Sequence, residues 1–159
     1  MSKMHEAPLQ STQDADLARR VGAHMLGADT VGRALAIELV SIEAGGATVR
    51  MRVRGDMLNA YGTCHGGVLA TLADSAFAYA ANSYNQLTVA AGFSIDLIAP
   101  AQEGDVLQAT CVVVERGRRN GFYDASVTNQ RGERIAMFRG RSHVMKDRPA
   151  VADALEPQP

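Results

Sequence analysis

The chain has 159 residues and a formal net charge of -1; 47% of its residues are hydrophobic and 21% are charged. These values suit one domain with a sizeable core and argue against a general nucleic-acid binder, which would carry a basic excess. No apolar run is long enough for a signal peptide or a membrane span, so we expect a soluble cytoplasmic protein that does not act on membranes. Two cysteines, Cys64 and Cys111, are too few for a disulfide framework.

The first third of the chain predicts a tail, a helix and two strands. Residues 1 to about 12 are polar and lack periodicity, so we expect a loose tail. From Asp14 to Gly27 the apolar residues recur at helical spacing. Residues 36–41 have strand character, a Gly-Gly turn follows, and residues 48–54 alternate between apolar and polar side chains. That alternation predicts a strand with one buried and one wet face.

The most apolar stretch, VLATLADSAFAYAAN at residues 68–82, predicts a helix. Apolar residues surround most of it, so we expect the helix to be buried. Three or four strands should follow, from segments at 87–97, 105–115, 122–128 and 134–144. This order predicts an α+β fold in which an antiparallel sheet curls around one long helix. We expect a tail and short helix at 1–30, the domain at 31–146, and a flexible tail at 147–159.

Asp74 is an unusual residue for the interior of this helix. Aspartate is a poor residue there, and a desolvated charge is costly without a partner. One interpretation is that Asp74 lies on an exposed strip or pairs with an arginine. No basic residue lies at helical spacing from it, however. The other interpretation is an unpaired carboxylate among apolar groups, which is more basic and suits a general base or nucleophile.

A glycine-containing turn, Thr63-Cys64-His65-Gly66-Gly67, precedes the helix. Free backbone N–H groups at a helix start can polarise a carbonyl oxygen or hold an anion, although the turn is also compatible with an ordinary loop-to-helix junction. Gly66 and Asp74 are eight residues apart, roughly 12 Å of helix rise. One chain could not easily place both on one small reacting group, whereas two chains with antiparallel helices could. We therefore expect a site at a dimer interface.

Other chemistry is less well supported by the sequence. A Cys64–His65 nucleophile pair is disfavoured because adjacent side chains rarely meet in hydrogen-bond geometry. The histidines lack zinc-ligand spacing and no phosphate-binding glycine loop appears, so we expect no metal and no bound cofactor. The arginines at 116, 118, 119, 139 and 141 fit equally well a solvated edge or a clamp for ligand phosphates.

Three segments resemble one known family, the hotdog-fold acyl-CoA thioesterases of the PaaI type, the phenylacetic acid degradation group. They are NAYGTCHGGVLATLADSAFAYAAN, GFSIDLIAPAQEGD and GRRNGFYDASVTNQRGERIAMFRGRSH. The resemblance covers about residues 36–144. It implies the hotdog fold, dimers that join two sheets and assemble into homotetramers, and hydrolysis of phenylacetyl- or hydroxyphenylacetyl-coenzyme A without a cofactor.

The resemblance also implies roles for residues. Asp74 would activate water as general base or attack the thioester itself, and the Gly66 N–H of the other protomer would polarise the carbonyl. Asn59 would orient the water or the carbonyl, with support from His65. The expected substrate-binding residues are Gly67, Ser75, Ser94, Arg118, Arg119 and Asn120.

Three rival functions remain at this stage. A non-catalytic acyl-CoA-binding or sensing protein would need a partner or DNA-binding segment, and the first ~30 residues lack a helix-turn-helix pattern. A hydratase on the same fold would need an Asp–His pair, which the single His65 at the helix start fits poorly. An assembly protein would leave Asp74 with a structural role.

Overall fold

A computed structural model of the chain describes residues 12–152; the expected N-terminal tail falls almost entirely outside this range. The elements in chain order are α1 (Thr12–Ala28), α2 (Thr30–Ala34), β1 (Glu38–Glu43), β2 (Gly46–Arg52), the 3-10 turn η1 (Gly55–Met57), α3 (Gly66–Asn82), β3 (Thr88–Leu97), β4 (Val106–Arg116), β5 (Asn120–Thr128) and β6 (Arg134–Val144). The predicted long helix and all of the predicted strands are present, with shifted ends.

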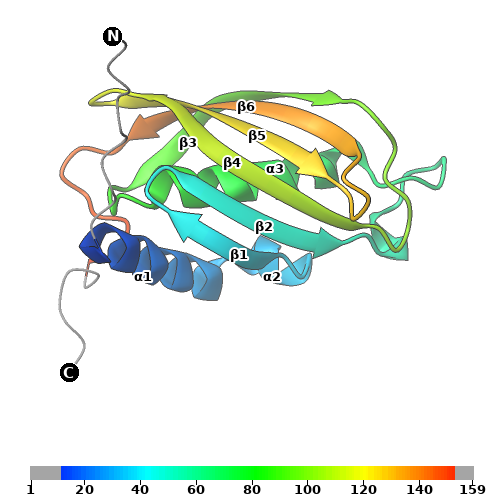
Figure 1. Ribbon diagram of the computed structural model, residues 1–159, viewed down its shortest axis with the longest axis horizontal. Coiled ribbons are helices and arrows are strands. Elements are labelled where there is room, and N and C mark those ends of the chain that lie inside the picture. Colours follow the sequence, from blue (N-terminus) through cyan, green and yellow to red (C-terminus); the bar gives the residue numbers. More distant parts are fainter. Residues whose placement is uncertain (1–11, 153–159) are drawn as a thin grey trace, which may run out of the picture.

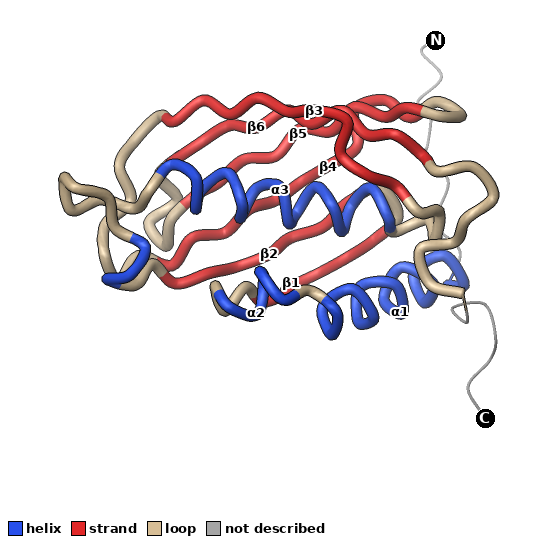
Figure 2. Tube along the Cα trace, turned by 180° about the vertical axis from the view of Figure 1, so that it is seen from behind, coloured by secondary structure: helices blue, strands red, loops and turns tan. Residues whose placement is uncertain are grey.

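The strands form one six-stranded sheet in the order β1-β2-β4-β5-β6-β3, and every neighbouring pair is antiparallel. The sheet curls around α3, while α1 and α2 lie along the β1 side of that helix (Figure 1, Figure 2). This is the hotdog arrangement, and it confirms the predicted α+β fold. The strand order leaves two edges, β1 and β3.

The core forms where α3 packs into the concave face of the sheet. Alternating residues of β2, β4 and β5 are buried there. For β2 this confirms the prediction from residues 48–54 of one buried and one solvent-exposed face. From α3 the core receives Leu69, Leu72, Ala73, Ala76, Phe77 and Ala80. Phe77 contacts the rings of Tyr123 and Phe138 at centroid distances of 5.2 and 5.8 Å. Burying each large side chain contributes roughly 1.5–3 kcal/mol, which holds α3 in place.

One strip of α3 is not covered by the chain's own sheet. Gly67 is exposed, and Ala70, Thr71, Asp74, Ser75 and Ala78 are only partly buried. These residues recur at helical spacing on one side and all have small side chains. In the view from behind, α3 lies between β3 and the α1–α2 pair (Figure 2).

The edge strand β3 is largely exposed to solvent, although several of its side chains are apolar. Of its residues only Thr88 is buried, and the apolar side chains of Phe93 and Leu97 are 49% and 56% exposed. An edge strand also leaves backbone N–H and C=O groups unpaired along one side. An open apolar edge therefore lies next to the uncovered strip of α3.

Asn82 and Ser83 fix the end of α3. The Asn82 side-chain amide donates to the carbonyls of Ala78 (3.0 Å) and Thr88 (2.9 Å), and its oxygen accepts from the Thr88 N–H (2.9 Å). The Ser83 hydroxyl accepts from the Gly45 N–H at 2.8 Å in the β1–β2 turn. Gly45 has a φ of 79°, which favours glycine. The helix is therefore tied to two strands that flank the site.

Three features differ from the sequence prediction. The helix α2 and the turn η1 were not predicted, because five and three residues are too short to show periodicity. The strand predicted at 36–41 begins instead at Glu38, because Ala36 has a φ of 53° and ends the α2 turn. The third difference concerns the tail expected at 147–159, whose first residues run beside residues 85–87. The Leu87 N–H donates to the Arg148 carbonyl, and the Val151 N–H donates to the Asn85 side-chain oxygen, both at 2.8 Å.

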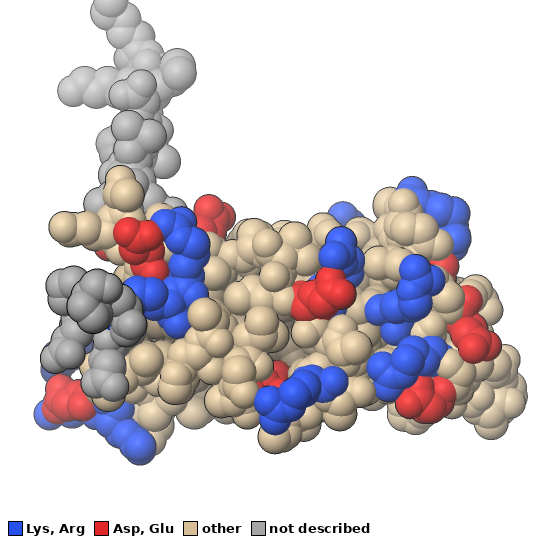
Figure 3. All heavy atoms as spheres, turned by 90° about the horizontal axis from the view of Figure 1, so that it is seen from below, with Lys and Arg blue, Asp and Glu red and all other residues tan. Residues whose placement is uncertain are grey.

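Charged side chains of both signs are interspersed over the face seen from below, without a continuous basic band (Figure 3). This distribution agrees with the small net charge of the chain. None of the helices between residues 12 and 152 is long and apolar enough to cross a membrane.

Replacing Asn82 with Ala should lower the free energy of unfolding by about 2–4 kcal/mol, because the Thr88 N–H and C=O lose a buried partner. Urea unfolding of the two proteins measures this difference. Asn82→Asp keeps an acceptor for the Thr88 N–H, but its buried carboxylate faces the Ala78 and Thr88 carbonyls at the end of the helix, so at neutral pH it should lower the free energy of unfolding at least as much as Asn82→Ala. A loss below about 0.5 kcal/mol for Asn82→Ala would contradict this role.

Candidate active site

Asp74 lies in the middle of the uncovered strip, with Ala73 and Phe77 buried on either side of the helix. Its carboxylate makes no hydrogen bond or ion pair with any residue between 12 and 152, and burial raises its pKa above the ordinary value. Of the alternative interpretation, the exposed strip is therefore partly confirmed, since Asp74 is only partly buried, whereas pairing with an arginine is not found among residues 12–152. An unpaired carboxylate with a raised pKa is suited to accept a proton or attack an electrophile.

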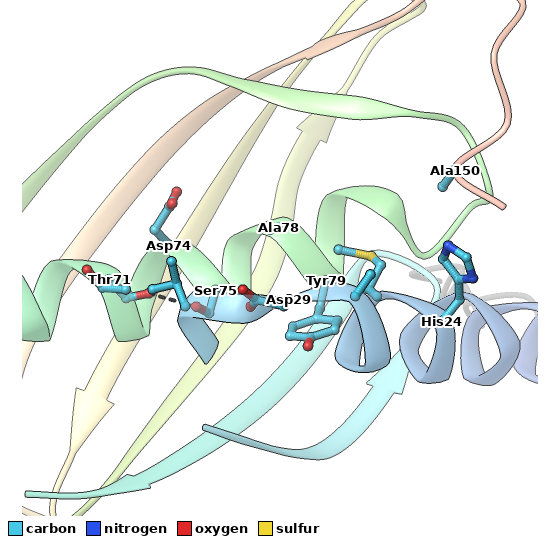
Figure 4. Close-up of a pocket in the computed structure, with 11 residues that line it drawn as sticks. His24, Asp29, Thr71, Asp74, Ser75, Ala78, Tyr79 and Ala150 are labelled. Carbon is cyan, nitrogen blue, oxygen red and sulfur yellow. Dashed lines mark hydrogen bonds between the residues drawn. The ribbon is translucent and has the colours of Figure 1, made fainter. Parts of the chain in front are cut away.

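Thr71 and Ser75 flank Asp74 on the same strip. The Thr71 hydroxyl donates to the Gly67 carbonyl, and the Ser75 hydroxyl donates to the Thr71 carbonyl, both at 2.9 Å. Figure 4 shows these side chains beside Asp74. Because both hydroxyl protons are used within α3, neither side chain neutralises Asp74, and both hydroxyl oxygens remain free to accept a bond from a ligand.

The start of α3 offers one backbone donor. His65 is the N-cap residue: its Nδ1 accepts from the Gly67 N–H at 2.9 Å, and its carbonyl accepts from Val68 and Leu69. The Gly66 N–H finds no acceptor among residues 12–152. The sequence prediction placed His65 in a supporting catalytic role; the structure gives it a capping role that leaves Gly66 as the unengaged donor.

Asn59 shapes the loop in front of that donor. Its side-chain oxygen accepts from the N–H groups of Tyr61 (2.9 Å) and Thr63 (3.2 Å), and its amide donates to the Thr63 hydroxyl (2.9 Å). Backbone bonds from Asn59 to Thr63 and from Gly62 to Asn59 complete the turn, and Gly62 has a φ of 77°. Most of the hydrogen-bonding capacity of Asn59 is therefore used within its own loop.

A pocket of about 560 Å³ runs along α3 from Asp74 toward the end of α1 (Figure 4). The strip of α3 and Tyr79 form one side of it. The α1–α2 segment forms the other side, with His24, Met25, Asp29 and Val31. Burial and the nearby Asp29 carboxylate raise the pKa of Tyr79 to about 12, so its hydroxyl stays protonated. The pocket therefore combines apolar side chains with the unpaired Asp74 carboxylate.

The remaining predicted residues lie elsewhere. Arg118 borders a second pocket of about 380 Å³, together with Lys146 and Arg148. Asn120 contacts His143 at 3.2 Å in the β5–β6 pair. Ser94 is paired with Arg139, whose guanidinium binds Asp124 at 2.6 Å on the outer face of the sheet. Cross-strand partners share a face, so Ser94 lies away from α3 in its own chain.

The cysteine hypothesis gains no support from the structure. Cys64 is buried and burial raises the pKa of its thiol, which disfavours the reactive thiolate. Within residues 12–152 no cluster of three or more His, Cys, Asp or Glu side chains could hold a metal ion.

Comparisons with known proteins agree with this geometry. The family model described as the thioesterase superfamily matches residues 61–136. The acyl-coenzyme A thioesterase PaaI of Escherichia coli (strain K12) is 44% identical over 115 residues, which is 72% of this chain and 82% of that protein. The chain belongs to the thioesterase superfamily. Within that superfamily it is of the PaaI type, and it is a thioester hydrolase.

Other thioesterases are similar along much of this one. Acyl-coenzyme A thioesterase 13 of Homo sapiens is 32% identical, covering 68% of this chain and 79% of that protein. The solved structure of E. coli PaaI, from the phenylacetic acid degradation operon, superposes with a TM-score of 0.81 at 40% identity, over 82% of this chain and 95% of that one. A thioesterase protein of Streptococcus pneumoniae TIGR4, solved with coenzyme A, has a TM-score of 0.68 at 28% identity, over 70% and 90% of the chains.

The sequence prediction missed the pocket wall formed by α1 and α2. Met25 was noticed only as part of an apolar helix face, and Asp29 only becomes recognisable as the N-cap of α2, accepting from the Gly32 N–H at 3.0 Å. Which side of α3 this wall faces depends on tertiary packing, for which the local pattern carries no signal.

Replacing Asp74 with Asn should stabilise the thioesterase at neutral pH by on the order of 1 kcal/mol, because it removes a desolvated charge. Folding raises the pKa of Asp74, so the native state favours the protonated form. The contribution of this protonated form to the stability of the wild type is fully present below the ordinary pKa. It is lost as the pH rises through the raised pKa. The gain should therefore be absent below about pH 3 and present at about pH 7 in urea unfolding. Equal stability of both proteins at all pH values would contradict it.

Proposed function

We propose that this PaaI-type thioesterase hydrolyses phenylacetyl- or hydroxyphenylacetyl-coenzyme A. The observation that carries the proposal is an unpaired, partly buried carboxylate at one end of an apolar pocket of about 560 Å³. A pocket of that volume accommodates an aryl ring, and Met25, Val31 and Ala78 give it apolar surface. The similarity to PaaI of E. coli, named an acyl-coenzyme A thioesterase and encoded in a phenylacetic acid degradation operon, supports the substrate class.

The reaction requires a base and a site for the developing oxyanion. Asp74 acts as general base: it takes a proton from water while the water oxygen attacks the thioester carbonyl. The Gly66 N–H of a second subunit donates to the oxyanion, the C–S bond breaks, and the proton returns to the departing coenzyme A thiolate. Direct attack by Asp74, giving an anhydride that water then hydrolyses, uses the same groups. A positioned base contributes roughly 10²–10⁴-fold and one oxyanion donor about 10²–10³-fold.

A homodimer brings these groups together. The open edge of β3 can pair with the same strand of a second copy, and the small residues of the α3 strip allow two helices to approach closely. With the helices antiparallel, Gly66 of each subunit lies opposite Asp74 of the other. Further pairing of dimers gives the homotetramer, with catalysis confined to the dimer interface.

The nucleotide part of coenzyme A binds outside the pocket. Arg118 shares a groove with Lys146 and Arg148, and Arg119 and Asn120 continue the same turn. This groove meets the acyl pocket at neighbouring residues, because Pro149 borders one and Ala150 the other. Arginine and lysine bind phosphate oxygens, and the S. pneumoniae relative was solved with coenzyme A. Gly67 and Ser75 contact the remainder of the substrate, and Asn59 with His65 holds the loop and the helix start. Ser94, on the outer face of the sheet, has no part in this proposal.

Replacing Asp74 with Ala or Asn should lower kcat by at least about 10²-fold while the fold is kept. Free-thiol release measures the rate on phenylacetyl-, hydroxyphenylacetyl- and acetyl-coenzyme A, and circular dichroism checks the fold. In the wild type, kcat/KM should rise with pH through the raised pKa of Asp74. Near-normal turnover in either variant would contradict the assignment of Asp74 as the catalytic group. Substrate binding without thiol release in the wild type would favour the alternative of an acyl-CoA-sensing protein.

Gly66→Pro tests the oxyanion donor without breaking the helix. Proline lacks the N–H but fits the first helical position, and His65 before it already has extended dihedral angles. We expect kcat to fall about 10²–10³-fold. Gly66→Ala is the matched control: it keeps the N–H, and its methyl group meets only the exposed side chain of Leu97.

The same variant shows whether the site is shared. Mixed dimers of Gly66→Pro and Asp74→Asn chains contain one site with both native residues, so mixing two inactive proteins should restore activity. Absence of restored activity in dimers verified to be mixed would place both groups in one chain and contradict the shared site.

A further inference from the structure

We infer that Tyr61 of each subunit closes the acyl pocket of the other and selects for aryl substrates; this inference rests on the proposed function. Tyr61 is 92% exposed, the largest exposed fraction among the large hydrophobic side chains of residues 12–152. Exposing a tyrosine ring to this extent brings no benefit to the isolated chain. The ring is available for a contact that one chain does not contain.

The loop that carries Tyr61 is held in a fixed shape. The Asn59 side chain binds the N–H of Tyr61 and both the N–H and hydroxyl of Thr63. Gly62 supplies the left-handed backbone that the turn requires. The loop projects beyond the start of α3, away from the body of the sheet (Figure 2). A tyrosine on a rigid, projecting loop is preorganised for docking, because little conformational entropy is lost on contact.

The antiparallel helix pairing determines where that loop reaches. When Gly66 of one subunit lies opposite Asp74 of the other, each residue further along α3 faces one residue further back on the partner. The position opposite Ala78 is then that of the partner's loop, at about Gly62. Ala78 lies four residues beyond Asp74, roughly 6 Å along the helix axis. Tyr61 of the partner therefore comes to the far half of the pocket.

That half of the pocket provides a matching surface. Ala78, Met25 and Ala150 line it, and His24 lies at its end (Figure 4). Ala78 carries only a methyl group, which leaves room for a ring from outside. Met25 offers a flexible thioether that packs well against aromatic rings. A substrate ring held between Met25 and the partner's Tyr61 is covered on both faces, whereas an acetyl group stops short of them.

Replacing Tyr61 with Ala should lower kcat/KM for phenylacetyl-coenzyme A about tenfold more than for acetyl-coenzyme A, since one hydrophobic pocket contact discriminates by roughly 10–200-fold. Tyr61→Phe keeps the ring and should keep the ratio of the two values. Phe122→Ala removes another exposed aromatic ring, on the outer face of β5, and should leave the ratio unchanged. Urea unfolding checks that all three variants keep their stability.

Mixed dimers separate an effect in the partner from one within the chain. In a dimer of an Asp74→Asn chain with a Tyr61→Ala chain, the one site with a native Asp74 faces a native Tyr61 from the partner, so the substrate ratio should be that of the wild type. In a dimer of the wild type with the double variant Asp74→Asn, Tyr61→Ala, the one site with a native Asp74 faces a partner loop that lacks the tyrosine ring, so the ratio should fall about tenfold.

Two results would overturn the inference: an unchanged ratio in Tyr61→Ala homodimers, or the opposite pattern in the two mixed dimers. Failure of the proposed function has a different signature. If Asp74→Asn homodimers hydrolyse the substrates at the wild-type rate, Asp74 is not the base, whatever the ratio for Tyr61→Ala.

Discussion

The site depends on one unfavourable interaction, the partial desolvation of Asp74 without a compensating charge. Burial raises the pKa of this carboxylate, and no residue between 12 and 152 pairs with it. The helix tolerates this because its opposite face buries Leu72 and Phe77 fully. Each such side chain stabilises the fold by roughly 1.5–3 kcal/mol, which outweighs the cost of one partly solvated carboxylate. Hydrogen bonds of Asn82 and Ser83 fix the end of the same helix.

The fold also supports the proposal that two chains share the site. A sheet can cover only part of a central helix, so the strip containing Asp74 remains open between β3 and the α1–α2 pair (Figure 2). At the start of α3, the Gly66 N–H finds no acceptor among residues 12–152, and it lies about two turns away from Asp74 on the same rigid helix. A helix cannot bend to bring its own start to its middle. In the proposed dimer the two groups meet because a second helix lies alongside in the opposite direction, which the small residues of the strip permit.

The sequence predicted those parts of the fold that depend on patterns within a single helix or strand. Alternation at residues 48–54 and the apolar run at 68–82 reflect burial within single elements, so β2 and α3 were found, and with them the fold. Asp74 could be recognised because its surroundings along the helix were apolar. The pocket could not be predicted, because it forms where Met25 and Asp29 meet Ala78 and Tyr79, residues about 50 positions apart that only tertiary packing brings together. Ser94 shows that a resemblance can also mislead. The family resemblance implied that Ser94 lies near the site, whereas the strand register places its side chain on the outer face of the sheet in its own chain.

The capping of α3 limits what the oxyanion site can do. A helix start normally offers several unpaired N–H groups, but His65 binds the Gly67 N–H with its ring and those of Val68 and Leu69 with its carbonyl. Only the Gly66 N–H remains. With one donor, transition-state stabilisation stays near the lower end of what oxyanion sites supply, about 10²–10³-fold, and more of the rate must come from Asp74 and from positioning of the acyl group. In the proposed dimer, closure of the pocket by a second subunit supplies that positioning. The proposed dimer contact would then both complete the chemistry and set which acyl groups are held well enough to react.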